Sequence, residues 1–211
     1  MKIKSIEPSK IKVKIDKTSE HIKMDGRERH LALGRLLEKG THSLDAESVV
    51  SAILKGYSIL PRIDIDNKVM QNLFAIDLLN VDNIPMYINM IVLYEEIGIP
   101  PFALLNIEND NDASFFRLLF ATDTLIRNEK DINKLKAILR AIAIENGIIC
   151  RCPSIIEGGN IKKYSFYGDI RVDDKTALSE FQPSYNRYIL KNSNYSSKIR
   201  YPKNWFKNNN Y

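Results

Sequence analysis

The sequence is poor in the residues that many catalytic and metal sites need. It has three histidines, His21, His30 and His42, and none follows His42. Its two cysteines, Cys150 and Cys152, are separated by a single residue, a spacing that suits neither a disulfide nor a zinc site. A Ser-His-Asp triad or a histidine-rich metal centre is therefore excluded from the main body of the chain. The cysteines are interpreted as structural.

Long apolar runs are also missing. No segment approaches the roughly 20 apolar residues that a membrane helix needs, and the opening stretch MKIKSIEPSK lacks the apolar centre of a signal peptide. We therefore expect a cytoplasmic protein with no membrane partner. With 211 residues, of which 44% are hydrophobic and 27% charged, the chain is long enough for one sizeable core or a core with an extension.

Negative charge is missing from the end of the sequence. The net charge is +5, and no aspartate or glutamate follows Glu180. Cations neutralise phosphates and flat rings stack on bases, so the mixture of basic and aromatic residues beyond Glu180 favours a nucleic-acid strand. Aromatic residues that pack onto a core would give the same composition, and both interpretations stay open. The candidate contacts in this segment are Arg187, Lys198, Arg200, Lys203, Trp205 and Lys207.

Alternation and helical spacing predict the first elements. KIKVKI (10–15) alternates strictly, which predicts a strand with one solvent-exposed face. A helix is expected at residues 27–39, and Ser43 is expected to cap a second helix that ends at Gly56. The inward side chains of the first helix are expected to be Leu33, Leu36 and Leu37.

The following part of the sequence has a different order of elements: strand, helix, two strands, helix, strand. This is the split βαβ, or ferredoxin-like, arrangement, in which a four-stranded antiparallel sheet carries two helices on one face. The other face is then expected to be open for a ligand. The expected strands are residues 73–79, 102–107, 115–121 and 147–152, and the expected helices are residues 85–98 and 129–145.

These patterns predict an α+β protein in three parts. An N-terminal strand with two helices (1–56) packs on the split βαβ core (57–165), and a basic, aromatic-rich segment (166–211) follows. An RNA-recognition module shares the core's element order, but its signature pattern does not match FFRLLFA (115–121). Phe74 and Phe116 could stack on bases, but core packing is the better interpretation of both.

Four short stretches occur in an order shared with a known family. LFAIDLLN (73–80) resembles the family's first motif, an apolar strand that ends in Ile-Asp-x-Asp-Asn. YEEIGIPPFALLNI (94–107) and SFFRLLFATDTLIRNEKDINKLKAIL (114–139) resemble its next helix end, strands and helix, and GGN (158–160) resembles its last glycines. Together they resemble the primase-polymerase domain of replication proteins from Firmicutes plasmids and related mobile elements, part of the archaeo-eukaryotic primase superfamily.

The resemblance implies a site where two or three carboxylates hold two divalent cations, and the sequence departs from it there. Asp77 fits the first position and Arg117 matches the family's Phe-Arg, but Leu79 replaces the second carboxylate. The histidine of the second motif is missing from NIENDND (106–112). We therefore expect a degenerate, inactive form with no cofactor, in which Mg or Mn matters only if Asp77 remains active, and in which Asp77→Ala leaves the biological activity intact.

Two alternatives for these carboxylates stay open. Asp77 can instead be a strand-end aspartate that is bonded to the backbone or to a lysine. Asp64 and Asp66 have the Asp-x-Asp spacing and could restore a metal site, although they precede the core strand.

Three classes of function follow. The first is an accessory protein of a mobile element that binds DNA or RNA through Arg117, Lys162, Lys163 and the basic residues after Glu180. The second is a counter-defence inhibitor of the anti-CRISPR type, which binds a nucleic-acid-guided nuclease or its guide RNA. The third is an active metal-dependent nucleotidyltransferase that uses Asp77 with acids of ENDNDAS (108–114), although that loop is better interpreted as a solvated turn.

Overall fold

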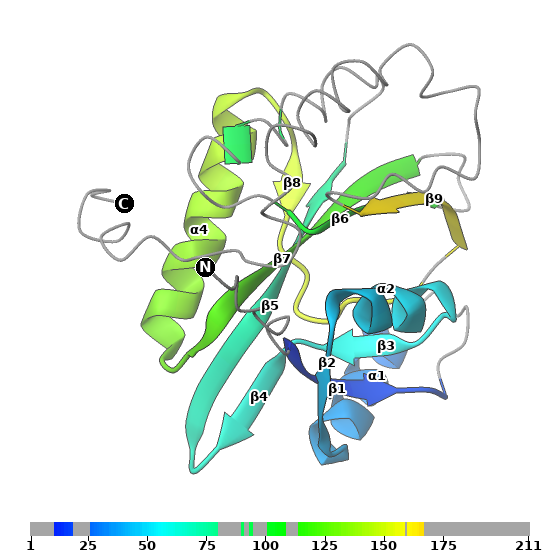
Figure 1. Cartoon of the computed structure of the whole chain (residues 1–211), viewed down its shortest axis with the longest axis vertical. Coiled ribbons are helices and arrows are strands. Elements are labelled where there is room, and N and C mark those ends of the chain that lie inside the picture. Colours follow the sequence, from blue (N-terminus) through cyan, green and yellow to red (C-terminus); the bar gives the residue numbers. More distant parts are fainter. Residues whose placement is uncertain are drawn as a thin grey trace, which may run out of the picture.

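Two antiparallel sheets and the helices α1, α2 and α4 make up the part of the chain that the structure describes (Figure 1). The α+β class expected from the sequence is confirmed. None of the described helices is long and apolar enough to span a bilayer. The structure is a computed structural model, and it describes residues 11–18, 26–79, 90, 93–94, 101–108, 114–158 and 160–166.

The smaller sheet has three strands in the order β2-β1-β3. Its strands are β1 (Ile11–Asp16), β2 (Thr41–Leu44) and β3 (Ser58–Leu60). Along the chain, helix α1 (Gly26–Glu38) follows β1 and precedes β2, and α2 (Ala46–Leu54) connects β2 to β3. Because β3 pairs with β1, this sheet continues past residue 56, the expected end of the first part.

The larger sheet has six strands, in the order β4-β5-β7-β6-β9 with β8 paired to β5. Each of these pairs is antiparallel. Helix α4 (Glu129–Glu145), which connects β7 to β8, has the bounds expected from the sequence. The strands are β4 (Arg62–Ile65), β5 (Lys68–Leu78), β6 (Ala103–Glu108), β7 (Ser114–Ile126), β8 (Cys150–Arg151) and β9 (Asn160–Phe166).

The helix expected at residues 85–98 falls largely outside the described residues. Met90, Leu93 and Tyr94 are described, and all three are helical. The hairpin expected from the two strands around ENDNDAS is confirmed, since β6 pairs with β7 from Ala103 to Glu108.

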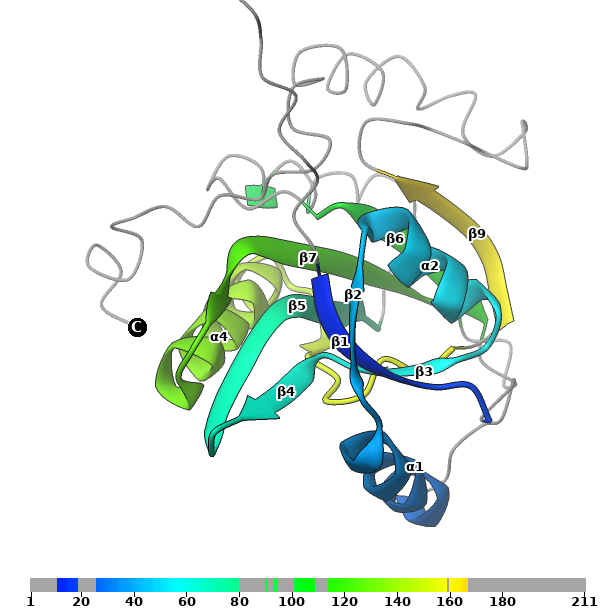
Figure 2. The ribbon, with the colours of Figure 1, turned by 60° about the horizontal axis from the view of Figure 1, so that its bottom comes forward.

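Both faces of the central strands β5 and β7 are buried, so the expectation of one open face was wrong. On one face, Phe120 forms an edge-on ring contact with Tyr94 at 5.0 Å between centroids, and the Tyr94 hydroxyl donates to the Leu139 carbonyl of α4 at 2.6 Å. On the opposite face, Leu105 and Leu119 have no exposed surface. Figure 2 shows why: α4 lies on one side of β5 and the smaller sheet lies on the other.

The contacts between the two sheets identify what covers the second face. The Lys12 backbone N–H donates to the Asn72 side-chain oxygen of β5 at 2.9 Å. Ile59 of β3 forms a two-way backbone bridge with Ile156, which follows β8. One continuous apolar cluster includes residues of both sheets, so burial of this face joins the N-terminal elements to the rest of the molecule.

Strand β1 does not have the solvent-exposed face that its alternating sequence predicted. Lys14 is buried, and its Nζ donates to the Leu37 carbonyl at 2.6 Å. Asp16 has no exposed surface and accepts from Arg35 Nε at 2.7 Å. Helix α1 covers these polar side chains and supplies their partners, which offsets the cost of burying them.

The inner face of α1 also differs from the prediction. Leu36 is buried as expected, but Leu37 is 46% exposed. Ala32 is fully buried in its place, because residues i and i+4 share one helix face and Ala32 with Leu36 sets the phase. Leu37 contacts the sheet through its backbone carbonyl, which accepts from Lys14 Nζ of β1, and not through its side chain.

The start of α2 is set by Asp45 rather than by Ser43. The Asp45 side chain accepts from the Ser48 backbone N–H at 2.7 Å, which is the geometry of an N-cap. Ser43 lies in β2 and is exposed. The expected end is confirmed, since Gly56 adopts the left-handed conformation that commonly closes a helix, with φ 79°.

Gly158 lies directly against the backbone of Gly56. A Cβ atom placed on Gly158 would be 2.3 Å from the Gly56 carbonyl carbon. This close approach brings the segment after β8 against the end of α2. The glycine in the GGN stretch therefore has a packing role in this fold.

Candidate functional site

Strand register brings Asp77 together with two arginines. Asp77 of β5 is opposite Arg117 of β7 and opposite Arg151 of β8. Side chains directly opposite one another in paired strands share a sheet face. Residues that are 40 and 74 positions away in the sequence therefore meet at one carboxylate.

The contact between Asp77 and Arg117 is a buried, two-pronged ion pair. Arg117 Nε donates to Asp77 Oδ1 at 2.6 Å, and its Nη2 donates to Oδ2 at 3.1 Å. The Asp77 side chain has no exposed surface and that of Arg117 is 2% exposed. Arg117 Nη1 donates to the Glu157 carbonyl at 2.9 Å, so each nitrogen of this guanidinium has an acceptor.

Arg151 approaches the same carboxylate from the solvent side. Its Nε donates to Asp77 Oδ2 at 2.9 Å, while its side chain stays 51% exposed. The Phe115 ring lies beside both guanidiniums, with the Cζ atoms of Arg117 and Arg151 each 5.6 Å from its centroid. We call Asp77, Arg117 and Arg151 the ion cluster. One anion and two cations give it a net charge of about +1 at neutral pH.

The ion cluster does not offer Asp77 to a metal ion. Both carboxylate oxygens already accept from guanidinium nitrogens, and two adjacent cations would repel a divalent cation. Within the described ranges, no three His, Cys, Asp or Glu side chains are grouped so that they could hold a metal ion. The partners of Asp77 are arginines, so the alternative of a backbone or lysine partner was wrong.

No family model, no curated protein and no solved structure matches the chain.

The function therefore depends on what the side chains of this chain can do. The other acids with Asp-x-Asp spacing, Asp64 and Asp66, lie far from Asp77. Asp64 lies in β4 opposite Val69, at the far end of β5 from Asp77. The eight residue steps from Val69 to Asp77 span about 26 Å in a strand. Asp66 stands in the β4–β5 turn with φ 53°. A metal site that combines Asp77 with this pair is excluded by that separation.

The acids of the ENDNDAS loop fall only in part within the described residues. Glu108 is the last residue of β6, where it pairs in register with Ser114. Asp110 and Asp112 lie outside the described residues.

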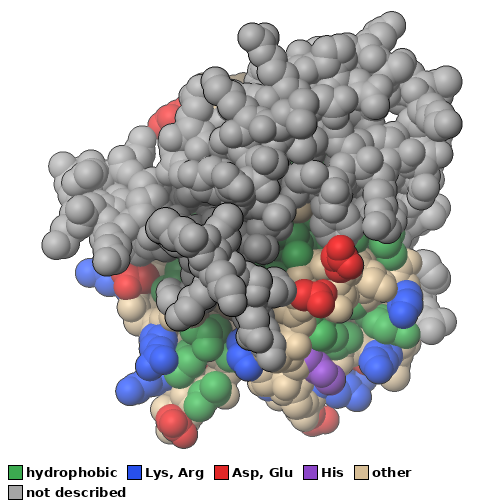
Figure 3. Space-filling view, in the orientation of Figure 1, with side chains coloured by type: hydrophobic (Ala, Val, Ile, Leu, Met, Phe, Trp, Pro, Cys, Tyr) green, Lys and Arg blue, Asp and Glu red, His purple; other side chains and the backbone are tan. Residues whose placement is uncertain are grey.

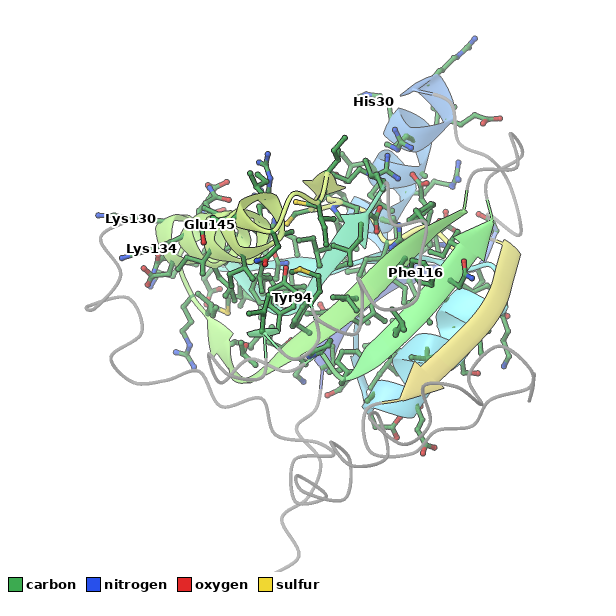
Figure 4. The ribbon with its side chains drawn as sticks, turned by 90° about the horizontal axis from the view of Figure 1, so that it is seen from above. His30, Tyr94, Phe116, Lys130, Lys134 and Glu145 are labelled. Carbon is green, nitrogen blue, oxygen red and sulfur yellow. The ribbon has the colours of Figure 1, made fainter. Side chains whose placement is uncertain are left out.

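The described histidines are exposed, and the side chains bonded to Asp77 are the two arginines. His30 is an exposed residue of α1, and Figure 4 shows it well apart from Tyr94 and Phe116 of the larger sheet region. His42 is exposed in β2. General-base chemistry at Asp77 therefore has no described histidine to support it.

The basic residues chosen from the sequence are placed unequally. Arg117 is buried and its nitrogens are occupied, so its interpretation as a surface contact for nucleic acid does not fit this geometry. Lys162 and Lys163 lie in β9, the outermost strand beside β6, where Lys163 is opposite Asn106. Six residues lie outside the described part of the chain: Arg187, Lys198, Arg200, Lys203, Trp205 and Lys207.

The two cysteines are held against α4. Cys150 Sγ lies 3.7 Å from the Arg140 carbonyl, and Cys152 Sγ lies 3.7 Å from the Lys136 carbonyl. Burial raises the pKa of both thiols, that of Cys152 to about 12. Thiols that stay protonated at neutral pH are poor nucleophiles and metal ligands. This environment agrees with a structural role.

A second buried carboxylate, Asp16, is also held by an arginine. Burial raises its pKa, but hydrogen bonds from Thr18 and Arg35 outweigh this, so the pKa of Asp16 lies below its usual 3.8. The Thr18 hydroxyl and backbone N–H both donate to Oδ1. The donors to this carboxylate are Thr18, which follows β1, and Arg35 of α1. Asp16 therefore connects β1 to α1 and is interpreted as structural.

Sequence reasoning missed Arg151, the exposed member of the ion cluster. The signal was the alternation in GIICRC: in a strand, Cys150 and Cys152 must share one face and Arg151 must occupy the other. The cysteines face α4, which places Arg151 on the Asp77 face. That inference requires the pairing of β8 with β5, and a single sequence does not state it.

Proposed function

We propose that this chain is a catalytically inactive, primase-like protein that binds nucleic acid without polymerase chemistry. The observation that carries the proposal is the ion cluster, in which Asp77 is held by two arginines where a metal-dependent transferase needs free carboxylates. Leu79 adds no second carboxylate two residues later.

The strand order supports the primase-like part of the proposal. Among the strands expected from the sequence, the pairing is β8-β5-β7-β6, and all neighbours are antiparallel. Helix α4 connects β7 to β8, as the second helix of a split βαβ unit does. In this arrangement Asp77 lies at the end of a central strand, where the resemblance implies the first carboxylate.

Charge supports the choice of nucleic acid as the partner. The chain has a net charge of +5, and the ion cluster contributes a surplus cation at the end of β5. On the face shown in Figure 3, lysine and arginine side chains lie at both sides of the described part and alternate with acids. We therefore place the contacts at the exposed side of the ion cluster, at Lys162 and Lys163, and in the basic segment after Glu180.

The test is fluorescence anisotropy with labelled single-stranded and duplex DNA and RNA over a salt series. We expect binding that weakens steeply with salt, because each phosphate contact releases counterions. Binding should persist in EDTA, and no nucleotide should be incorporated when Mg or Mn is added. Replacement of Lys198, Arg200, Lys203 and Lys207 by alanine should lower the salt slope by up to about 3 for single strands.

Two results would overturn the proposal. Metal-dependent nucleotide incorporation that is lost in Asp77→Ala would show an active site. Failure to bind any of the four nucleic acids at moderate salt would instead favour a protein or ribonucleoprotein target, such as the nuclease bound by an inhibitor of the anti-CRISPR type.

A further inference from the structure

Arg151 has binding capacity that the ion cluster does not use. Its Nε donates to Asp77, and the two terminal amino groups of a guanidinium carry four further N–H donors. No described residue accepts a hydrogen bond from these amino groups, and the side chain is 51% exposed. Arg117, by contrast, is buried and has an acceptor at every nitrogen.

The charge of Arg151 is not needed to neutralise Asp77. Arg117 already forms a two-pronged pair with this carboxylate, and both members are buried. The other acid nearby, Glu157, forms its own pair with Arg29 at 2.7 Å. A half-exposed ion pair such as Arg151–Asp77 contributes little to stability. A surplus positive charge therefore remains at the surface of the ion cluster.

The guanidinium of Arg151 is also held in place before any ligand arrives. Asp77 fixes its Nε, and the Phe115 ring lies 5.6 Å from its Cζ. A planar guanidinium that is already oriented loses less conformational entropy when it binds, and its geometry matches the oxygens of a phosphoryl group.

We propose that Arg151, oriented by Asp77 and Phe115, is the contact through which this protein binds a phosphoryl group. The group is either a backbone phosphate of a nucleic-acid strand or the phosphate chain of a free nucleotide. In the first case the inference rests on the proposed function and locates its contact. In the second it requires no strand binding.

The experiment compares Arg151→Gln with Arg62→Gln in two titrations. Arg62 is the matched control because it is 45% exposed and paired with Asp64 in β4, near the far end of β5. The probes are a labelled single-stranded oligonucleotide, followed by anisotropy, and inorganic tripolyphosphate, followed by calorimetry. Arg151→Gln should weaken strand binding about tenfold and lower the salt slope by about 1. Arg62→Gln should bind as the parent chain does.

Each outcome decides the inference. If strand binding is unaffected in Arg151→Gln, the inference is wrong while the proposed function stands. If the parent chain binds no strand but binds tripolyphosphate, and Arg151→Gln does not, the proposed function fails and the phosphoryl contact is supported for free nucleotides. Binding of neither probe by the parent chain overturns both.

A folding control accompanies the variant. Because Arg151 is half exposed, its replacement should leave the thermal midpoint nearly unchanged. If Arg151→Gln unfolds, Arg151→Lys replaces it in both titrations. Lysine keeps the charge and loses the planar fork, so intermediate binding is expected, and binding equal to that of the parent chain would reject a guanidinium-specific contact.

Discussion

At the scale of single residues, the most consequential group is Asp77. Burial of a lone carboxylate costs several kcal/mol, and the two arginines offset that cost through charge-assisted hydrogen bonds. Removal of Asp77 or of Arg117 would leave the other one buried without its counter-ion. The side chain that resembles a catalytic residue in the sequence is therefore a structural anchor in the fold.

Asp77→Asn should lower the free energy of unfolding by about 3–5 kcal/mol, because Arg117 would keep its buried charge without a counter-ion. Urea denaturation followed by circular dichroism measures the change. Asp64→Asn is the control: Asp64 is exposed and pairs with Arg62, so its replacement should change stability by no more than about 0.5 kcal/mol. Equal midpoints for the two variants would contradict the assignment.

This expectation modifies the prediction that Asp77→Ala leaves the biological activity intact. The sequence indicated that the carboxylate is not catalytic, but it did not show that the fold depends on it. Activity of an Asp77 variant must therefore be compared at equal folded fraction. A loss of activity in proportion to the unfolded fraction would reflect stability and would not bear on catalysis.

Single residues also show what the sequence could and could not reveal about the site. Asp77 and Arg117 were singled out because their stretches resemble motifs of the primase-polymerase family, although their pairing with each other was not predicted. Arg151 was not, because its relation to Asp77 depends on a pairing between segments 74 residues apart. Register across a sheet depends on long-range contacts that periodicity within one segment does not contain.

At the scale of elements, strong periodicity predicted where a long helix such as α4 lies, whereas short strands were not predicted. Helix α4 has caps and an apolar face in its own sequence, with Asn128 accepting from the Asp131 N–H at its start. Strand β2, THSL, has no alternating apolar pattern and was not predicted. It exists because β1 offers a hydrogen-bonding edge, a cause that lies outside its own residues.

The two candidate caps of α2 provide a matched test at this scale. Asp45→Ala should cost about 1 kcal/mol, because the Ser48 backbone N–H would lose its acceptor. Ser43→Ala should cost much less, since Ser43 is exposed in β2. Thermal denaturation of both variants measures the difference. A larger loss for Ser43→Ala would reinstate the cap expected from the sequence.

At the scale of the whole molecule, the N-terminal elements pack on one face of the larger sheet and bury it. The sequence predicted that residues 1–56 pack on the core, yet it also predicted an open sheet face. These two expectations compete for the same surface. The apolar side chains of β1 and α2 could be recognised as inward-facing, but their destination depends on how whole layers pack.

The close contact between Gly158 and the Gly56 backbone can be tested by substitution. Gly158→Ala should lower stability by about 1–3 kcal/mol, because the new Cβ would meet the Gly56 backbone rather than a flexible side chain. Gly34→Ala in α1 has open space around the new Cβ and should raise stability by about 0.5–1 kcal/mol. The midpoint of chemical denaturation should therefore fall for Gly158→Ala and rise for Gly34→Ala. Shifts of the same sign would refute the close contact.

On the proposed function, the ion cluster also bears on whether mutation could give this chain a metal site. Leu79→Asp would create the Asp-x-Asp spacing in a single step, but the neighbouring carboxylate would still be held by Arg117 and Arg151. A bound cation would require the loss of both arginines as well, and the loss of Arg117 would leave the buried Asp77 without its main counter-ion. Any such path therefore passes through a destabilised variant.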